Sequence, residues 1–307
     1  MLDLQRLRTL QAVSRYGSLR GAADALYLTA SAVSQQLGKL ETETGQKLLE
    51  RQGRGVRLTD AACLLVSHAD RILSLVEQAE ADLEENKGAV VGNLTLGTFA
   101  TAARSLVPRV LRQLEDVHPG LSVNLQEMEP EQALAGVTRG TLDLSVVVAW
   151  ANAPLEISDH LDREVLLTDS ADLALPRDHP LAERDTVRLE ELQDQVWISW
   201  PRGSICHDWL VLTLRGLGIE PQIAHTALEH ATQVALVEAG LGAAVLPRLG
   251  RGPVPEGVSI VSVVPALERQ VFAVWREDAG RRPAITALVD ALRQQGKSSS
   301  QVADSAG

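Results

Sequence analysis

The sequence predicts a multidomain protein of mixed α+β and α/β class, with a small helical head, one long helix and a larger α/β body. Three observations predict this arrangement. Short helices and an Arg/Gly hairpin occupy residues 1–59, an unbroken helical pattern covers residues 60–88, and strands alternate with helices from residue 91 onward. A length of 307 residues suits two or three domains.

Charge is distributed unevenly along the chain. Residues 1–59 hold nine Lys and Arg against five acids, a net charge of +4, whereas the rest of the chain carries −15. A basic head on an acidic body indicates that the head alone has a polyanionic partner. Taken by itself, the asymmetry has chance variation on a solvated surface as its alternative explanation.

Other features of the sequence bound its location and its cofactors. No apolar run approaches the ~18 residues of a membrane span, and no basic patch with a following apolar stretch opens the chain, so we expect a cytoplasmic protein without a membrane partner. Cys63 and Cys206 are the only cysteines. Two such cysteines are typical of buried, unpaired thiols, with a redox switch as the alternative. No spacing resembles a metal site, and no cofactor is expected.

The head is expected to contain three helices. Apolar residues at three-residue steps predict the first, at Leu4, Leu7, Leu10 and Val13. Ser18 is a good N-cap for a second helix, whose small side chains allow close packing. After a turn at Tyr27–Thr29, either Thr29 or Ser31 caps the third helix.

The third helix has an apolar face and a polar face. Its core side is predicted to be Val33, Leu37, Leu40 and Thr44, and its outward side Ser31, Ser34, Gln35, Gly38 and Thr42. Short polar side chains reach phosphates and base edges, and Gln35 could pair with an adenine through two hydrogen bonds. After Gly45 ends the helix, the hairpin Arg51–Arg57 offers three guanidinium groups to the flanking backbone.

These parts together predict an N-terminal winged helix-turn-helix over residues 1–59 that binds double-stranded promoter DNA. A face that is merely solvated is the alternative for the third helix alone. The helix-turn-helix spans about Ser18 to Leu37. Contacts with DNA are expected from Ser18, Thr29, Ala30, Ser31, Ser34, Gln35, Lys39, Arg51 and Arg54.

The segments GSLRGAADALYLTASAVSQQLGKLE and LLERQGRGVRLTDA resemble the N-terminal domain of LysR-type transcriptional regulators, without gaps over about sixty residues. Leu19 and Leu49 stand where Phe is common in that family, and Ala62 replaces a Gly. Ala30-Ser31 stands where Gln-Pro is usual, and Gln35 takes a place where Arg is frequent. These last departures fall at expected DNA contacts, so the operator of this chain need not be the one usual in the family.

A long linker helix is predicted over residues 60–88. Its apolar stripe has the alternating three- and four-residue steps of a heptad seam, at Leu65, His68/Ala69, Ile72, Leu75/Val76, Ala79 and Leu83. The stripe could pack on its own domain, but a helix of this length between two domains favours pairing with a second copy. The resemblance implies a dimerising linker helix and a homotetramer built as a dimer of dimers.

Two sets of alternating strands and helices follow. The first runs over the strands Gly92–Phe99, Leu121–Met128 and Leu142–Ala149, and the second over Val196–Trp200, Gln222–Thr226 and Gly242–Leu246. With crossover strands near Arg163–Leu167 and Arg269–Trp275, they are similar to the two-lobed α/β periplasmic-binding-protein fold. GTLDLSVVV and VEAGLGAAVLPR carry a looser resemblance to the LysR-type effector domain over residues 91–296.

The domain boundaries follow from this organisation. An effector-binding domain is expected over residues 89–296, with lobe I at about 91–165 and 268–296 and lobe II at about 166–267. The tail 297–307 is rich in Ser, Ala and Gln and is expected to be disordered.

An effector site is expected where strands of the two lobes end. Thr98–Ala102 follows the first strand, and Pro201–Ser204 has the Gly and Ser of a backbone anion nest. Across one cleft they favour a small anionic effector with Arg202 as counter-charge, although each segment could serve only as loop and cap. The candidate residues are Thr98, Ala100, Thr101, Glu129, Trp150, Pro201, Arg202, Ser204 and His230.

Catalysis is not expected. Cys206-His207-Asp208 resembles a nucleophile, base and acid, but consecutive helical residues point about 100° apart and cannot form a relay. No HExxH, P-loop or dinucleotide motif occurs.

The predicted function is therefore a LysR-type regulator that activates or represses transcription in response to a small effector, with RNA polymerase as a further possible partner. The alternatives are a small-molecule binding or transport protein of the periplasmic-binding-protein type, and a nucleoid-type DNA binder without an effector.

Overall fold

The computed structural model describes residues 2–26, 28–52, 55–85 and 90–305. The chain divides into two compact units, one of residues 1–88 with Arg139–Thr141, the other of residues 89–138 with 142–307. The boundary near residue 88 falls between α4 (Asp60–Glu85) and β3 (Gly92–Thr98).

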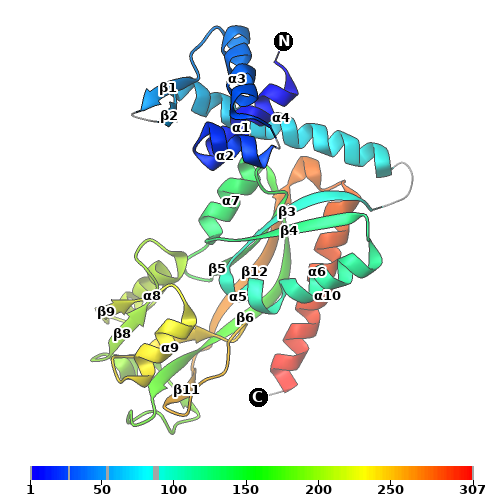
Figure 1. Ribbon diagram of the computed structural model, residues 1–307. Coiled ribbons are helices and arrows are strands. Elements are labelled where there is room, and N and C mark those ends of the chain that lie inside the picture. Colours follow the sequence, from blue (N-terminus) through cyan, green and yellow to red (C-terminus); the bar gives the residue numbers. More distant parts are fainter. Residues whose placement is uncertain (1, 27, 53–54, 86–89, 306–307) are drawn as a thin grey trace. The chain divides into compact units, whose positions relative to one another are not determined.

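Three helices and a hairpin form the head: α1 (Leu4–Tyr16), α2 (Leu19–Ala25), α3 (Ala30–Thr44), β1 (Leu49–Gln52) and β2 (Gly55–Leu58) (Figure 1). Each helix begins at a side chain that accepts a backbone N–H, namely Asp3, Ser18 and Thr29. Such caps stabilise a helix by ~1 kcal/mol. Of the two candidate caps for α3, Thr29 is the one used.

The head closes around apolar side chains from all three helices. Of the four predicted core residues of α3, Thr44 is only half-buried. Val33, Leu37 and Leu40 are at most 2% exposed. They share one buried cluster with side chains from α1, α2 and the start of α4, among them Leu7, Leu10, Ala22, Ala23, Ala62, Ala69 and Leu73. The first half of α4 is thus part of the head's core.

The predicted seam of α4 is divided between two environments. Ala69 of the seam is buried in the head, and Leu65 and Ile72 pack against the head's core. Leu73, which is not a seam residue, is buried there as well, and Asp70 accepts a hydrogen bond of 2.6 Å from the Gln11 side chain on α1. Leu75 and Leu83, further along, are 61% and 67% exposed. Three- and four-residue spacing is the same for packing within a chain and between chains, so the sequence could not separate the two halves. The predicted helix end at Lys87–Gly88 lies outside the described residues.

The body is built on an eight-stranded sheet in the order β4-β3-β5-β12-β6-β11-β7, with β10 also paired to β6. Besides β3, its strands are β4 (Leu121–Glu127), β5 (Leu144–Trp150), β6 (Leu161–Pro176), β7 (Thr186–Val187), β10 (Ala244–Pro247), β11 (Val258–Val263) and β12 (Leu267–Arg276). β3 pairs in parallel with β4 and β5, as alternating strands and helices predict. β8 (Val196–Ser199) and β9 (Gln222–Thr226) form a separate parallel pair.

β6 and β12 are longer than the predicted crossovers and pair antiparallel along ten residues of β12 (Figure 1). β6 then continues to Pro176 and pairs with β10 and β11. The two lobes therefore share one continuous sheet, with the two crossover strands at its middle. Each lobe keeps its own buried clusters.

The helices of the body cover the two ends of this sheet. α5 (Ala100–Ser105), α6 (Val107–Val117), α7 (Pro130–Arg139) and α10 (Pro283–Ser305) belong to lobe I, and α8 (Ile205–Gly216) and α9 (His230–Glu238) to lobe II. Two short 3₁₀ helices lie at η1 (Leu189–Leu192) and η2 (Glu277–Ala279).

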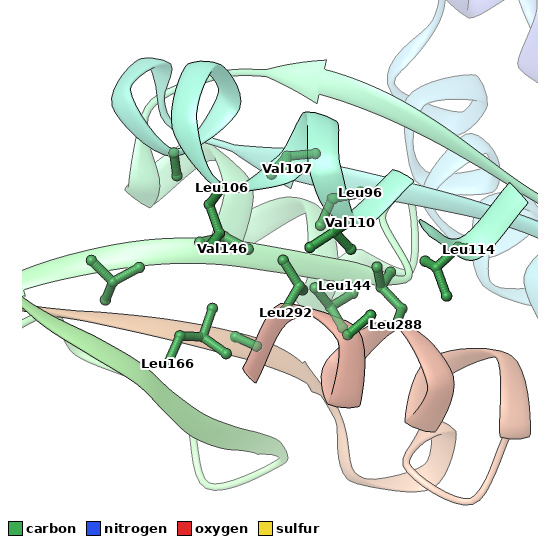
Figure 2. Packing of buried hydrophobic residues seen from close by; sticks show 14 of the residues in the cluster. Leu96, Leu106, Val107, Val110, Leu114, Leu144, Val146, Leu166, Leu288 and Leu292 are labelled. Carbon is green, nitrogen blue, oxygen red and sulfur yellow. The ribbon is translucent and has the colours of Figure 1, made fainter. Parts of the chain in front are cut away.

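The lobe I core is aliphatic. Figure 2 shows Val107, Val110 and Leu114 of α6 and Leu288 and Leu292 of α10 packed with strand side chains such as Leu96, Leu144 and Val146. The lobe II core is richer in indole rings. Trp197, Trp200 and Trp209 are buried there, and Trp150 stacks on Trp209 with ring centroids 3.7 Å apart.

The prediction of a disordered tail over residues 297–307 is wrong as far as residue 305. α10 continues to Ser305. The helix is already nucleated by its buried turns at Leu288 and Leu292, and extending an existing helix costs little compared with starting one. No Pro or Gly interrupts the chain between Lys297 and Ser305. Composition alone suggested disorder because it ignores this upstream anchor.

Candidate functional site

α3 presents a continuous polar face. Ala30, Ser31, Ser34, Gln35 and Lys39 are all exposed. Gly38 and Thr42, which continue the face, are exposed as well. The residues predicted from the helical rotation are thus brought together on one side of one helix, opposite its buried side.

The turn before α3 fixes how this face begins. Thr29 accepts the Ala32 N–H at 3.2 Å, and its hydroxyl lies 3.0 Å from the hydroxyl of Ser31. Ser18 accepts the Gly21 N–H at 3.0 Å and so starts α2. Both side chains serve as caps and remain exposed, so each has a structural role that is independent of DNA.

Glu41, the first acid of α3, is used within the head. Its carboxylate accepts hydrogen bonds from Lys47 Nζ at 2.9 Å and from the backbone N–H groups of Leu48 at 2.8 Å and Leu49 at 3.3 Å. Burial alone would raise the pKa of Glu41, but these hydrogen bonds outweigh it and hold the pKa below its usual range. The ionised carboxylate therefore links α3 to the start of β1, and its negative charge is compensated by Lys47 and the two N–H groups.

β1 and β2 form the predicted wing. They pair antiparallel with Glu50 opposite Arg57, and Arg57 Nη2 lies 3.2 Å from the Glu50 carboxylate. One of the three guanidinium groups expected in the hairpin is therefore already paired. Arg51 lies in β1, where the structure describes its backbone, and Arg54 lies outside the described residues.

A cavity of about 320 Å³ lies between the two lobes of the body. Its walls come from the ends of β3, β4 and β8, from the starts of α5, α7, α8 and α9, and from the middle of the sheet. It is lined by Phe99, Ala100, Thr101, Glu127, Met128, Glu129, Pro130, Gln132, Val148, Trp200, Ile205, Cys206, Leu228, His230 and Arg269.

Arg269 is the only cation in this lining, and it is 2% exposed. Its Nε and Nη2 both lie 2.8 Å from Oδ2 of Asp169, and Nη2 also donates to Thr101 Oγ1 at 3.1 Å. The guanidinium carbon lies 5.5 Å from the Phe99 ring centroid and 5.6 Å from that of Trp150. The cation is thus fixed by a crossover strand, with its opposite charge on the neighbouring strand.

A glycine holds Thr101 in place. Gly250 has a φ of 67°, and a Cβ at this position would lie 2.5 Å from the Thr101 carbonyl oxygen. Any side chain would therefore be strained and would push the start of α5. The loop after β10 can approach α5 only because residue 250 is Gly.

Three titratable residues of the lining, Glu129, His230 and Cys206, have shifted pKa values. Burial, together with the carboxylates of Glu131 and Glu127, raises the pKa of Glu129. Burial and the charges of Arg269, Arg104 and Arg251 lower the pKa of His230 to about 4. His230 is consequently neutral at pH 7, and neither of its buried ring nitrogens has a partner among the described residues.

Of the nine predicted effector residues, four line the cavity: Ala100, Thr101, Glu129 and His230. Thr98 and Trp150 lie behind its wall. Thr98 is fully buried at the end of β3, and Trp150 stacks on Trp209.

The remaining three, Pro201, Arg202 and Ser204, do not line the cavity. Ser204 caps α8 by accepting the His207 N–H at 3.3 Å, and its own hydroxyl donates to the Pro201 carbonyl at 2.8 Å. Arg202 is exposed, and the cation that lines the cavity is Arg269.

Sequence reasoning missed Arg269 as a cavity residue. Its segment, LERQVFAVW, has only the alternating pattern of a strand, so the sequence predicts a crossover strand there and no binding residue. One signal was available: Arg269 and Asp169 are charged residues at inward positions of two apolar strands, and such charges are buried in pairs. Cys206 was likewise left unassigned and lines the cavity, where burial raises the pKa of its thiol.

The Cys206-His207-Asp208 sequence does not form a relay. Cys206 lines the cavity, whereas His207 is buried with Nδ1 3.2 Å from Ser199 Oγ and 3.1 Å from the Trp200 carbonyl oxygen, and Asp208 is exposed. Within the described ranges, no cluster of three His, Cys, Asp or Glu could hold a metal ion. Over the same ranges, no helix is both long enough and apolar enough to cross a membrane.

Comparison with known proteins assigns both units. Residues 4–63 match the family described as "Bacterial regulatory helix-turn-helix protein, lysR family", and residues 87–297 match "LysR substrate binding domain". The chain belongs to the LysR family of transcriptional regulators. It is a LysR-family regulator with a helix-turn-helix head and an effector-binding body. The alternative hypothesis of a small-molecule transport protein does not explain the helix-turn-helix match.

Full-length relatives support this assignment. The "Probable HTH-type transcriptional regulator LrrA" of Synechococcus elongatus is 30% identical over 294 residues, which cover 95% of this LysR-family chain and 97% of that one. A "Probable RuBisCO transcriptional regulator" of Cyanidium caldarium is 29% identical over 243 residues, 78% of this chain and 76% of that one.

Solved LysR-family structures share the fold. Full-length OxyR from Pseudomonas aeruginosa has a TM-score of 0.71 at 23% identity, covering 95% of this chain and 98% of that one. Full-length CbnR complexed with its target DNA has a TM-score of 0.69 at 21% identity, with 96% and 100% covered.

Proposed function

We propose that this LysR-family regulator reads promoter DNA with the outward face of α3, chiefly Ser31, Ser34 and Gln35. The observation that carries the proposal is that this face is exposed and free of acid up to Lys39, while Glu41 is neutralised against Lys47 and the start of β1. Ser18, Thr29, Ala30 and Lys39 flank the base-reading positions, where they reach phosphates. Arg51 and Arg54 supply the wing's contacts with the flanking backbone.

We further propose that α4 joins two copies and that two such dimers form a tetramer. Leu64, Leu75 and Leu83 support this, because each is more than 60% exposed in the single chain. Paired heads fit an operator with two-fold related half-sites. We infer that the protein meets RNA polymerase at the promoter, where it activates or represses transcription, and that it acts in the cytoplasm.

The cavity of the body is proposed to hold a small acidic effector. A carboxylate or similar group is received by Arg269 and Thr101, since Nη1 of this guanidinium has no hydrogen-bond partner in the described part of the chain. The effector acts by binding one arrangement of the subunits better than another, without a chemical step. The separate surroundings of Cys206, His207 and Asp208 support binding rather than catalysis.

The DNA-reading proposal is tested by substituting Gln35. Duplexes are first selected by the wild-type protein from a randomised pool, and binding of the selected site and its single-base variants is then measured. Gln35→Ala should lose roughly 1–3 kcal/mol of discrimination at one base pair, because a bidentate contact with a base edge is lost.

Gln5→Ala is the matched control, because Gln5 is an equally exposed glutamine on α1 of the same unit. It should leave affinity and base preference unchanged. An unaltered base preference in Gln35→Ala would contradict the assignment of this residue.

A further inference from the structure

The charges of the cavity lie at two separate places. Arg269 sits on β12 at the middle of the sheet and is already paired with Asp169. Glu127 and Glu129 line the cavity from the end of β4 and the segment before α7, and Glu131 adds a third carboxylate close enough to act on Glu129. A ligand that enters this space meets one compensated cation and a group of uncompensated acids.

Among the described residues, the Glu129 carboxylate has no ion-pair or hydrogen-bond partner, and its pKa is shifted only by burial and by the neighbouring carboxylates. It precedes α7, yet only its backbone carbonyl is used there, accepting the Ala133 N–H at 3.0 Å. An unpaired, half-buried carboxylate is unfavourable unless something positive approaches it. A purely anionic ligand would add a further negative charge beside it.

His230 marks a second unsatisfied position in the same cavity. Both ring nitrogens are buried without a partner in the part of the chain that the structure describes. The Trp200 ring contacts the imidazole edge-on, with centroids 5.7 Å apart, and so fixes its orientation. A neutral imidazole offers one donor and one acceptor, which suits a polar ligand and adds no positive charge.

Size and apolarity limit the ligand further. The cavity of about 320 Å³ is at the small end of ligand sites. Phe99, Met128, Ile205 and Leu228 supply an apolar wall between the charged places. The space therefore suits a molecule of a few carbons rather than an extended or multiply charged one.

We propose that the effector is a small zwitterionic amino acid, whose carboxylate binds Arg269 and Thr101 and whose ammonium group binds Glu129 beside Glu127. The inference rests on the proposed effector cavity and specifies the class of its ligand. The apolar wall then receives the amino acid's carbon chain, and His230 takes a remaining polar atom. Recognition at both ends excludes plain carboxylates and plain amines alike.

The test is calorimetric titration of the full-length protein with two matched sets of compounds. The first set contains α- and ω-amino acids, namely L-alanine, L-serine, L-valine, L-glutamate, β-alanine and γ-aminobutyrate. The second contains the acids that carry a hydroxyl or hydrogen in place of the ammonium group, such as L-lactate, glycerate and butyrate. At least one amino acid should bind tenfold or more tightly than its matched acid.

Glu129→Gln should remove this preference, with a tenfold or greater loss of affinity for the amino acid and no change for the acid. Glu183→Gln is the matched control, because Glu183 is an exposed glutamate of the same unit that neither lines the cavity nor acts on Glu129. It should keep the preference of the wild type.

Two results would overturn the inference. If a plain acid binds as tightly as its amino acid, and Glu129→Gln changes neither, the acidic-effector proposal stands and the zwitterion is wrong. If no compound of either set binds a protein that still binds its selected DNA, both the acidic effector and the zwitterion are wrong.

Discussion

At the scale of single residues, the body is distinguished by charged side chains that are buried in ion pairs. Arg269 and Asp169 form one buried pair beside the cavity, and Asp172, three residues further along β6, forms another cluster. The Asp172 carboxylate accepts hydrogen bonds from Arg248 at 2.8 and 2.9 Å and from Arg251 at 2.5 Å. Burial alone would raise the pKa of Asp172, but the two arginines outweigh it and lower the pKa.

This cluster predicts acid sensitivity of the body. Because the folded pKa of Asp172 lies below its unfolded value, its stabilisation is present above the unfolded pKa, about 3.9, and is lost as the pH falls through the folded pKa. Asp172→Asn should lower the free energy of unfolding at pH 7 by roughly 2–4 kcal/mol, because two arginines lose their acceptor. The variant should also lose less stability than the wild type between pH 5 and pH 3.

Urea unfolding followed by tryptophan fluorescence measures this, since all five tryptophans lie in the body. Asp178→Asn, an exposed change on the same lobe, is the control and should behave as the wild type. Equal pH dependence in Asp172→Asn and the wild type would show that this cluster contributes no acid-sensitive stability.

At the scale of single residues, the sequence identified several candidate side chains, but not which distant residues they contact. Ser31, Ser34 and Gln35 could be placed because a helical rotation alone determines which residues share an outward face. Thr101, Glu129 and His230 were named for their positions at the ends of elements, and they do line one cavity. Arg269 could not be found in this way, because its place in the cavity depends on contacts with Asp169 and Thr101, which are 100 and 168 residues away.

Among the elements, α10 shows how packing overrides composition. Its residues 297–305 have the composition of a disordered tail, yet the helix persists because its earlier turns are anchored in the lobe I core (Figure 2). Gly296 is buried within this helix, and a Cβ there would lie 2.5 Å from the Leu166 carbonyl oxygen on β6. The absence of a side chain lets α10 approach the crossover strand.

Gly296→Ala should therefore destabilise the body, although alanine favours helices. The clash with a backbone oxygen is expected to cost roughly 1–3 kcal/mol net, since neither main chain can move without repacking. Gly216→Ala is the matched control in α8, where an added Cβ meets nothing within 4 Å, and it should stabilise by up to ~1 kcal/mol. Urea unfolding followed by tryptophan fluorescence compares the two. Equal effects of the two substitutions would contradict the close approach of α10 to β6.

For the whole molecule, the main feature that the single chain leaves unexplained is the exposed apolar side chains on the second half of α4. Leu75 and Leu83 are more than 60% exposed on a helix whose first half is fixed in the head. Leucines in a coiled-coil seam stabilise the pair by burial, each by roughly 1.5–3 kcal/mol. The second copy of α4 proposed above would bury this seam.

Leu75→Lys with Leu83→Lys should accordingly separate the dimer while leaving each unit folded. Sedimentation velocity at a series of protein concentrations should show the dissociation constant rise roughly tenfold or more. Leu212→Lys, at a leucine of α8 that is 52% exposed, should leave assembly unchanged. Assembly that is unaffected by the double substitution would place the dimer contact elsewhere than on α4.

The sequence by itself determined the class of this protein, its two functional units and which residues form the outward polar face of α3. These features depend on local periodicity, capping and motif order, which neighbouring residues in the chain control. The tertiary structure alone decided that the lobes share one sheet through β6 and β12, that α4 is half core and half exposed, and which side chains meet in the cavity. The physical reason is that burial and charge pairing join residues far apart in sequence, so no local pattern encodes them.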